Sequence, residues 1–117
     1  MPAMKNIDTT SHRSFFEPLL QTASLQAATM VLKPGKSSSD QPENEHPKAE
    51  QWLFVISGAG KAKVGSQSTT LKTGSLLLIE KGEPHQITND GNEPLVTLNF
   101  YAPPAYTPKG NVKASVE

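Results

Sequence analysis

The chain of 117 residues contains no cysteine. Disulfide bonds, thiolate nucleophiles and zinc sites built from cysteine are therefore excluded, whereas the compartment is only weakly constrained. The 11 basic and 11 acidic side chains cancel, and the lysines are not gathered into a stripe along the sequence. A nucleic-acid backbone and an anionic membrane are therefore poor candidates for a partner. We expect the partner to be a small molecule or another protein.

Long apolar segments are also missing. The longest uninterrupted apolar run, residues 52–56, is far shorter than the core of a secretion signal or a membrane span, and residues 1–13 contain no apolar stretch. The sequence therefore predicts a soluble cytoplasmic protein. A chain of this length has room for one domain, which removes roughly two-thirds of its extended surface from water.

Short segments separated by turn residues dominate the middle of the chain. We expect strands at residues 51–57, 61–64, 68–72, 75–79, 85–88 and 95–101. In residues 22–32, apolar and polar side chains alternate loosely. This pattern is compatible with a strand, or with a helix that Pro34 and Gly35 would stop. About eight short strands at hairpin spacing predict an all-β fold, a small antiparallel barrel or sandwich with few open edges.

The two ends of the chain differ from this pattern. Residues 1–12 are polar, and residues 103–117 are interrupted by prolines and carry few groups suited to burial. We therefore expect a flexible N-terminal segment at 1–12, a β-barrel at 13–102 and a C-terminal tail at 103–117. Inside the barrel, residues 33–48 form a long polar loop, and such loops are usually functional or mobile.

The two-residue period of a strand predicts which side chains face inward. In residues 51–57, Gln51 shares one side with Leu53 and Val55, and Trp52 shares the other with Phe54 and Ile56. The apolar residues that we assign to the barrel interior are Leu53, Val55, Leu76, Leu78 and Ile87.

Residues 58–61 (GAGK) invite comparison with a phosphate-binding loop. They lie between two strands and lack the second glycine, lysine and hydroxyl element, so we interpret them as a hairpin turn.

Two histidines lie next to expected strands. His46 ends the polar loop before residues 51–57, and His85 begins residues 85–88. If the two strands are neighbours, both imidazoles lie at one mouth of the barrel, which favours a metal site. The alternatives are an exposed loop histidine at 46 and a backbone-bonded histidine at 85. His12 lies in the polar N-terminal segment, and we assign it no role.

The segments around these histidines resemble the paired motifs of the cupin superfamily, in particular its small single-domain members. The second cupin motif runs Gly, five residues, Pro-x-Gly, two residues, His, three residues, Asn. It falls here on Gly74, Gly82, His85 and Asn89 with every spacing kept, and Glu80 stands at the proline position. The resemblance implies a jelly-roll barrel, or double-stranded β-helix.

The first cupin motif, which contains His-x-His, a glutamate and a closing glycine, is matched in part. Gly58 closes the pattern, His46 takes the second histidine and Asn44 stands at the first. Counting back from Gly58 places Gln51 at the position of the glutamate, whereas counting from His46 allows Glu50 or Gln51. We expect Gln51 to face the cavity because the strand period fixes its side. A bulge would turn Glu50 inward instead.

The resemblance thus implies a metal site with His46, His85, Gln51 and Asn44 as candidate ligands. All four are neutral, and an amide oxygen offers a cation a dipole where a carboxylate offers a full charge, so we expect weak binding. If a metal binds, the imidazoles suit Zn, Ni, Fe or Cu better than Mg or Ca.

Three functions follow from the resemblance. The first is an enzyme that uses the metal for oxygenase- or isomerase-type chemistry on a small organic substrate. The second is a metal-free, non-catalytic barrel that binds a sugar or another small effector. The third, compatible with either, is a homodimer that buries Phe15, Phe16 and the Trp52 side of its strand. The family hosts many activities, so the fold does not choose among them.

Overall fold

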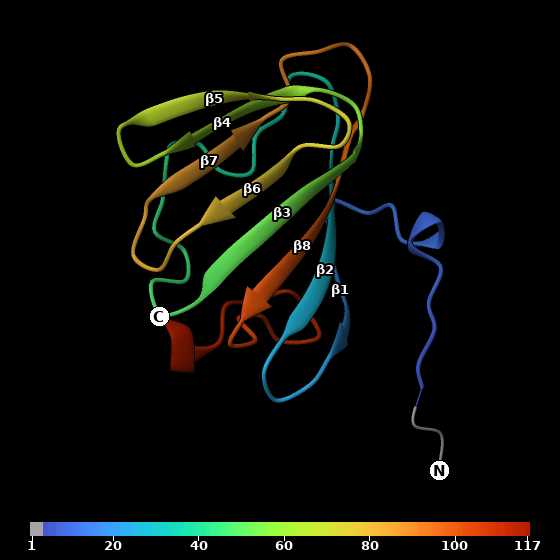
Figure 1. Ribbon diagram of the computed structural model, residues 1–117, viewed down its shortest axis with the longest axis vertical. Coiled ribbons are helices and arrows are strands. Elements are labelled where there is room, and N and C mark those ends of the chain that lie inside the picture. Colours follow the sequence, from blue (N-terminus) through green and yellow to red (C-terminus); the bar gives the residue numbers. More distant parts are fainter. Residues whose placement is uncertain (1–3) are drawn as a thin grey trace.

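The computed structural model describes residues 4–117, which form eight strands and two short 3-10 helices (Figure 1). The strands are β1 Phe16–Gln21, β2 Gln26–Leu32, β3 Glu50–Ser57, β4 Gly60–Val64, β5 Gln67–Leu71, β6 Leu76–Ile79, β7 His85–Thr88 and β8 Leu95–Ala102. One sheet has the order β1-β2-β8-β3-β6 and the other the order β5-β4-β7, with antiparallel pairing in both. The predicted all-β, jelly-roll architecture is confirmed.

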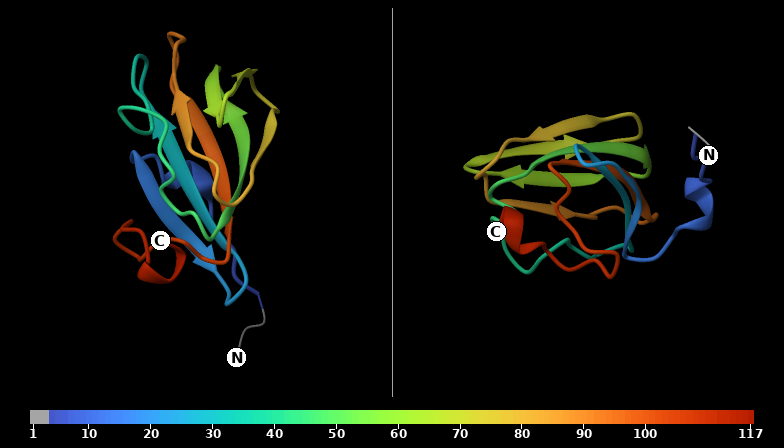
Figure 2. Two further views of the ribbon diagram at one scale, coloured as in Figure 1. Left: turned by 90° about the vertical axis from the view of Figure 1, so that its left-hand side faces the viewer. Right: turned by 90° about the horizontal axis from the view of Figure 1, so that it is seen from below.

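The two sheets face each other (Figure 2), and the hydrophobic core is built from buried residues of both. The buried core residues come from both sheets: Met30, Leu32, Leu53, Val55, Ala62, Leu71, Ile87 and Leu95. In β3, Leu53 and Val55 are buried whereas Trp52 and Phe54 are exposed, as the two-residue period predicts.

The interior assignment is wrong at two positions of β6. Leu76 and Leu78 are 65% and 41% exposed and lie opposite Phe54 and Trp52 of β3, whereas Ile79 is buried. All four residues of β6 are apolar, so the sequence contains no alternation from which to choose the inward side.

The first two strands differ from the expectation in another way. Residues 26–32 form a strand rather than the alternative helix, because they pair with β8 along the whole of β2. β1 was not predicted at all. Glu17 and Pro18 interrupt its alternation, and its pairing with β2 becomes irregular between Pro18 and Gln21.

The connection after β3 is not the hairpin that the sequence predicted. β3 pairs with β6 and β8, and β4 pairs with β5 and β7, so residues 58–59 carry the chain from one sheet to the other. Gly58 has a φ of 97°, and a Cβ there would lie 2.4 Å from the carbonyl oxygen of Pro94. The glycine therefore serves a close approach of two backbones.

Residues 103–117 fold against the lower end of the barrel in Figure 1. Most of their side chains are exposed or half-buried, but Ala105, Tyr106 and Val116 are buried. The buried side chain of Gln26 holds the segment. Its Oε1 accepts the backbone N–H groups of Ala105 and Tyr106 at 3.0 and 2.9 Å, and its Nε2 donates to the carbonyl of Tyr106 at 2.8 Å.

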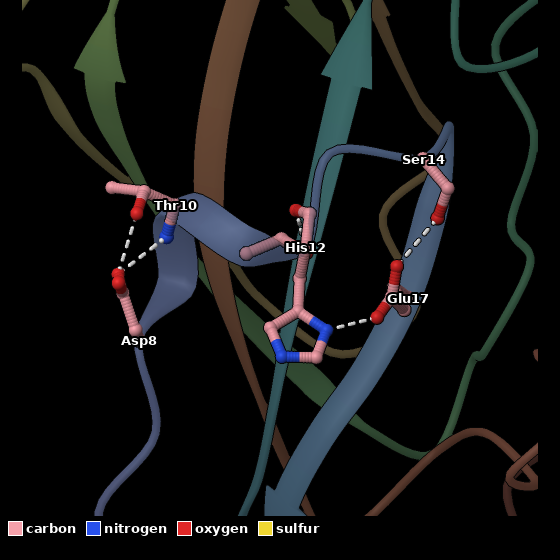
Figure 3. Close-up of polar contacts among 6 residues, drawn as sticks. Asp8, Thr10, His12, Ser14 and Glu17 are labelled. Carbon is pink, nitrogen blue, oxygen red and sulfur yellow. Dashed lines mark hydrogen bonds and ion pairs between the residues drawn. The ribbon is translucent and has the colours of Figure 1, made fainter.

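Residues 1–3 of the expected flexible N-terminal segment lie outside the described residues. Thr9–Ser11 forms the 3-10 helix η1, and the next residues contact the barrel. The carbonyl of His12 accepts the hydroxyl of Thr29 at 3.1 Å, and the His12 ring contacts Glu17, which also accepts the hydroxyl of Ser14 at 2.8 Å (Figure 3). These bonds fasten residues 12–14 to β1 and β2.

Within residues 4–117, no helix has both the length and the apolar character that a membrane crossing requires.

Three aromatic rings, Phe16 of β1, Tyr101 of β8 and Tyr106 of the C-terminal segment, pack against one another. The ring centroids of Phe16 and Tyr106 are 4.7 Å apart, and those of Tyr101 and Tyr106 are 4.9 Å apart. Burial raises the pKa of Tyr101 well above its ordinary value of 10.0, and it raises the pKa of Tyr106 as well.

Gly58→Ala is expected to destabilise the fold more than Gly74→Ala. Gly58 and Gly74 have φ values of 97° and 91°, but only at Gly58 does a new Cβ meet backbone atoms. Strain alone costs about 1 kcal/mol, and the clash raises the loss at Gly58 to about 2 kcal/mol or more. Urea unfolding measures both free energies, and equal losses would contradict the close approach described above.

Both phenols are expected to resist ionisation until the fold opens. A phenol whose pKa is raised on folding contributes stability below pH 10, and this contribution is lost as the pH rises through the folded value. The chain has two tyrosines, both in this cluster, so the phenolate absorbance near 295 nm reports on them alone. We expect this absorbance to rise together with the loss of circular dichroism above pH 10. Independent ionisation of either tyrosine near pH 10 in the folded protein would contradict its burial.

Candidate functional site

The polar loop between β2 and β3 lies along the edge strand β7. Ser37 bridges to Thr88, and Glu43 bridges to His85 through two backbone hydrogen bonds of 3.0 and 2.9 Å. This course brings His46 beside His85, with their ring centroids 5.0 Å apart. Both side chains are buried. The two imidazoles lie together as expected, but β3 and β7 belong to different sheets and are not neighbours, so the path of the loop and not strand pairing brings His46 to His85.

Gln51 enters the same site from the start of β3. Its side chain is buried, and its Oε1 lies 3.1 Å from Nε2 of His46. Glu50 turns to the other side, where it accepts the indole N–H of Trp52 at 2.7 Å. Asn44 is exposed and does not line the cavity beside these residues. The structure thus assembles three of the four candidate residues and leaves Asn44 outside.

Each histidine is oriented by a backbone carbonyl. Nδ1 of His46 lies 3.0 Å from the carbonyl oxygen of Ala49, and Nδ1 of His85 lies 2.9 Å from that of Glu83. A carbonyl oxygen only accepts, so each Nδ1 carries the proton, and Nε2 of the neutral ring keeps its lone pair. Histidines that bind metals are commonly held in this way.

A row of hydrogen bonds sets the orientation of the Gln51 amide. Nε2 of Gln51 donates to Oδ1 of Asn99, and Nδ2 of Asn99 donates to the hydroxyl of Thr97, both at 3.0 Å. The Thr97 hydroxyl then donates to the carbonyl of Met30 at 3.1 Å. Turning the Gln51 amide over would require Asn99 to turn too, and Thr97 would lose its bond to Met30. The row therefore directs the Gln51 oxygen at the lone pair of His46.

With a proton on Nδ1 alone, His46 presents Nε2 as an acceptor to a second acceptor, Oε1 of Gln51, at 3.1 Å. The lone pairs of the two acceptor atoms repel each other. A positive charge between them, either a proton on Nε2 of His46 or a metal ion in front of both atoms, removes this repulsion. Together with Nε2 of His85 these atoms offer two imidazoles and one amide oxygen, a donor set that fits a borderline transition metal. Within the described part of the chain, no group of three or more His, Cys, Asp or Glu side chains is placed to hold a metal. The donor set is therefore neutral and fits weak binding.

A cavity of about 260 Å³ adjoins these residues. Gln51 and His85 form part of its wall, and the rings of Phe16, Tyr101 and Tyr106 form another part. The C-terminal segment contributes Tyr106 together with residues 109 and 110. The cavity thus combines an aromatic wall with a polar one, as sites for small organic molecules do.

Burial shifts the charge state of two cavity residues. It lowers the pKa of His85, which favours the neutral ring near pH 7. It raises the pKa of the Glu45 carboxyl, and the nearby His46 opposes this effect only in part. Glu45 therefore holds its proton to a higher pH than an exposed glutamate.

Sequence reasoning assigned no role to Glu45, Tyr101 or Tyr106. A signal for Tyr101 was present, because it shares one side of β8 with Thr97 and Asn99, and polar residues on one side of a strand indicate a polar interior. Tyr106 follows the last strand, where no periodicity marks a buried side chain.

The geometry can be set beside known proteins. A family model described as a cupin domain matches residues 28–101. The chain is 30% identical over 78 residues to the tetracenomycin polyketide synthase protein TcmJ of Streptomyces glaucescens, a match that covers 67% of this chain and 50% of that protein. It is 33% identical over 73 residues to the protein YrkC of Bacillus subtilis (strain 168), a match that covers 57% of this chain and 39% of that protein. The chain thus spans half or less of the length of these curated relatives.

A solved structure extends the likeness to most of the chain. The crystal structure of BH2720 from Bacillus halodurans superposes with a TM-score of 0.78 at 28% identity, covering 89% of this chain and 80% of that one. The matched strands carry both segments that resemble the cupin motifs. The chain therefore belongs to the cupin family.

Proposed function

We propose that this cupin barrel binds a divalent transition metal ion, Zn, Ni, Fe or Cu, and a small organic molecule in the adjoining cavity. Nε2 of His46, Nε2 of His85 and Oε1 of Gln51 are the proposed ligands of the ion. The observation that carries the proposal is the pair of acceptors 3.1 Å apart, one on a histidine whose Nδ1 already donates to a backbone carbonyl. When bound, such an ion would polarise an oxygen of the organic molecule.

The cavity wall indicates the kind of molecule that fits. Phe16, Tyr101 and Tyr106 suit a flat or apolar body, and the edges of His85 and Gln51 suit a hydrogen-bonding group at its end. Glu45 lies in the same wall with a raised pKa, which suits it to exchange a proton with that group.

A second candidate is a barrel that binds its ligand without a metal. It is favoured by the neutral donor set, because among residues 4–117 no carboxylate joins the two imidazoles in a metal-binding group. A proton on Nε2 of His46 would then satisfy Gln51, and His85 would hydrogen-bond a neutral polar ligand directly.

Gln51→Glu is expected to strengthen metal binding at least about tenfold, because it brings a full negative charge to a partly dry site that now holds a dipole. His46→Ala and His85→Ala are expected to abolish binding, since each removes a nitrogen ligand. Isothermal titration with Zn²⁺ and with Ni²⁺ measures each affinity.

His12→Ala is the matched control, because His12 is the third histidine of the chain and lies outside the site. If His12→Ala weakens metal binding as much as His46→Ala does, the metal binds elsewhere. If wild type and Gln51→Glu both fail to bind either ion, the metal proposal is wrong and the metal-free candidate replaces it.

A second copy of the chain is the partner that we propose for the outer face of the larger sheet. Four exposed apolar side chains meet there, Trp52 and Phe54 on β3 and Leu76 and Leu78 on β6, opposite one another in register. The face is apolar across both strands, so two copies can cover each other's side chains around a twofold axis. Phe16, which the sequence assigned to this interface, instead packs on Tyr106 inside the barrel end.

Leu76→Glu is expected to convert a dimer into a monomer, because the change buries an unpaired carboxylate in the proposed interface. Sedimentation velocity at micromolar concentration measures the mass. Thr70→Glu adds the same charge to an exposed position on β5 and should leave the dimer intact. If the wild-type protein is a monomer at this concentration, the proposed dimer is wrong.

A further inference from the structure

A second hollow, of about 460 Å³, lies where β2 ends. Residues 13–15 form one rim, and the turn of residues 33–37 forms the other. Phe15 borders both this hollow and the cavity described above, whereas the two histidines and Gln51 do not line it. It is therefore a separate site.

Three cations line this hollow and no acid does. They are Arg13, Lys33 and Lys36. The ion pairs found within residues 4–117 join His12 to Glu17 and Lys61 to Asp90, so the three cations have no carboxylate partner there. Three unopposed positive charges around one hollow produce a local positive potential in a chain whose net charge is zero.

Glu17 is the acid nearest to Arg13 in the sequence, and it is already engaged. Its carboxylate contacts the ring of His12 and accepts the hydroxyl of Ser14, as Figure 3 shows. The hydrogen bonds of His12 with β1 and β2 pin the backbone on one side of Arg13, and the Ser14 bond pins it on the other. The side chain of Arg13 thus extends from a backbone segment that is held against the barrel.

The opposite rim is held as well. The backbone N–H of Lys36 donates to the carbonyl of Lys33 at 3.0 Å, which closes a turn. Asn89 fastens this turn, because Gly35 donates to its carbonyl and its own N–H donates to Lys36, both at 2.9 Å. Less conformational freedom of the backbone is therefore lost when the three cations bind a ligand than if they stood on loose loops.

The remaining lining residues suit an organic group attached to the anion. Phe15 and Val31 offer apolar surface, and Ser37, whose hydroxyl is 2.9 Å from that of Thr88, offers a hydroxyl that can also contact an oxyanion. The volume exceeds what a bare ion needs. We propose that this basic pocket binds the phosphate group of a small phosphorylated molecule. A dianion matches three cations better than a single carboxylate does, and the arginine fork fits two phosphate oxygens.

Backbone ¹H–¹⁵N NMR titration with inorganic phosphate, at constant ionic strength set by chloride, tests the proposal. We expect saturable shifts concentrated at residues 13–15 and 33–37, and weaker binding of acetate. The triple variant Arg13→Gln, Lys33→Gln, Lys36→Gln is expected to lose phosphate affinity at least tenfold. The control variant Lys63→Gln, Lys72→Gln, Lys81→Gln removes three exposed charges elsewhere and should keep wild-type affinity.

Phosphate affinity that survives in the triple variant, or shifts spread equally over all lysines, would overturn the proposal. Acetate binding as strong as phosphate binding would overturn the preference for a dianion. Circular dichroism establishes that the triple variant is folded. Its Zn²⁺ and Ni²⁺ affinities should equal those of the wild type, so the outcome here is distinguishable from the outcome for the histidine site.

Discussion

The buried row from Gln51 through Asn99 and Thr97 to Met30 is the interaction on which the interior depends. It crosses β3, β8 and β2, the three adjacent strands at the centre of the larger sheet. Gln51, Asn99 and Thr97 are almost fully buried, and each donates one side-chain hydrogen bond within the row. Because an unpaired buried polar group costs about 1–3 kcal/mol, a slip of any one strand would be penalised at several positions at once.

The same row links the fold to the site. It ends at the Gln51 oxygen, which faces His46, so the register of the sheet determines what that histidine meets. The site and the sheet are therefore one structural unit at this point. The basic pocket depends on the fold in a different way, because its cations stand on segments outside the strands and only their backbones are tied to the barrel.

Local rules were sufficient to predict part of this structure. The two-residue period places Gln51 inward and Glu50 outward, and the motif spacing pairs His46 with His85. The period fails in β6, where every residue is apolar. In the loop, no period applies, and its path along β7 leaves Asn44 exposed and puts Glu45 into the cavity wall.

The burial of the C-terminal segment could not be predicted from local sequence rules for another reason. Its burial rests on the side chain of Gln26, which is about 80 residues away in sequence. Composition reports only that the segment is rich in proline and polar residues. A long-range polar contact of this kind has no signature in a single sequence.

The origin of the cavity wall has a consequence for how such a barrel diverges. One part of the wall, at residues 106–110, belongs to no strand and is joined to the barrel end through the backbone and the ring of Tyr106. The exposed side chain of Lys109 can be exchanged while the strand register and the polar row stay as they are. Ligand preference is thus free to drift at Lys109 at little risk to folding, whereas the Tyr106 ring is tied to the aromatic cluster.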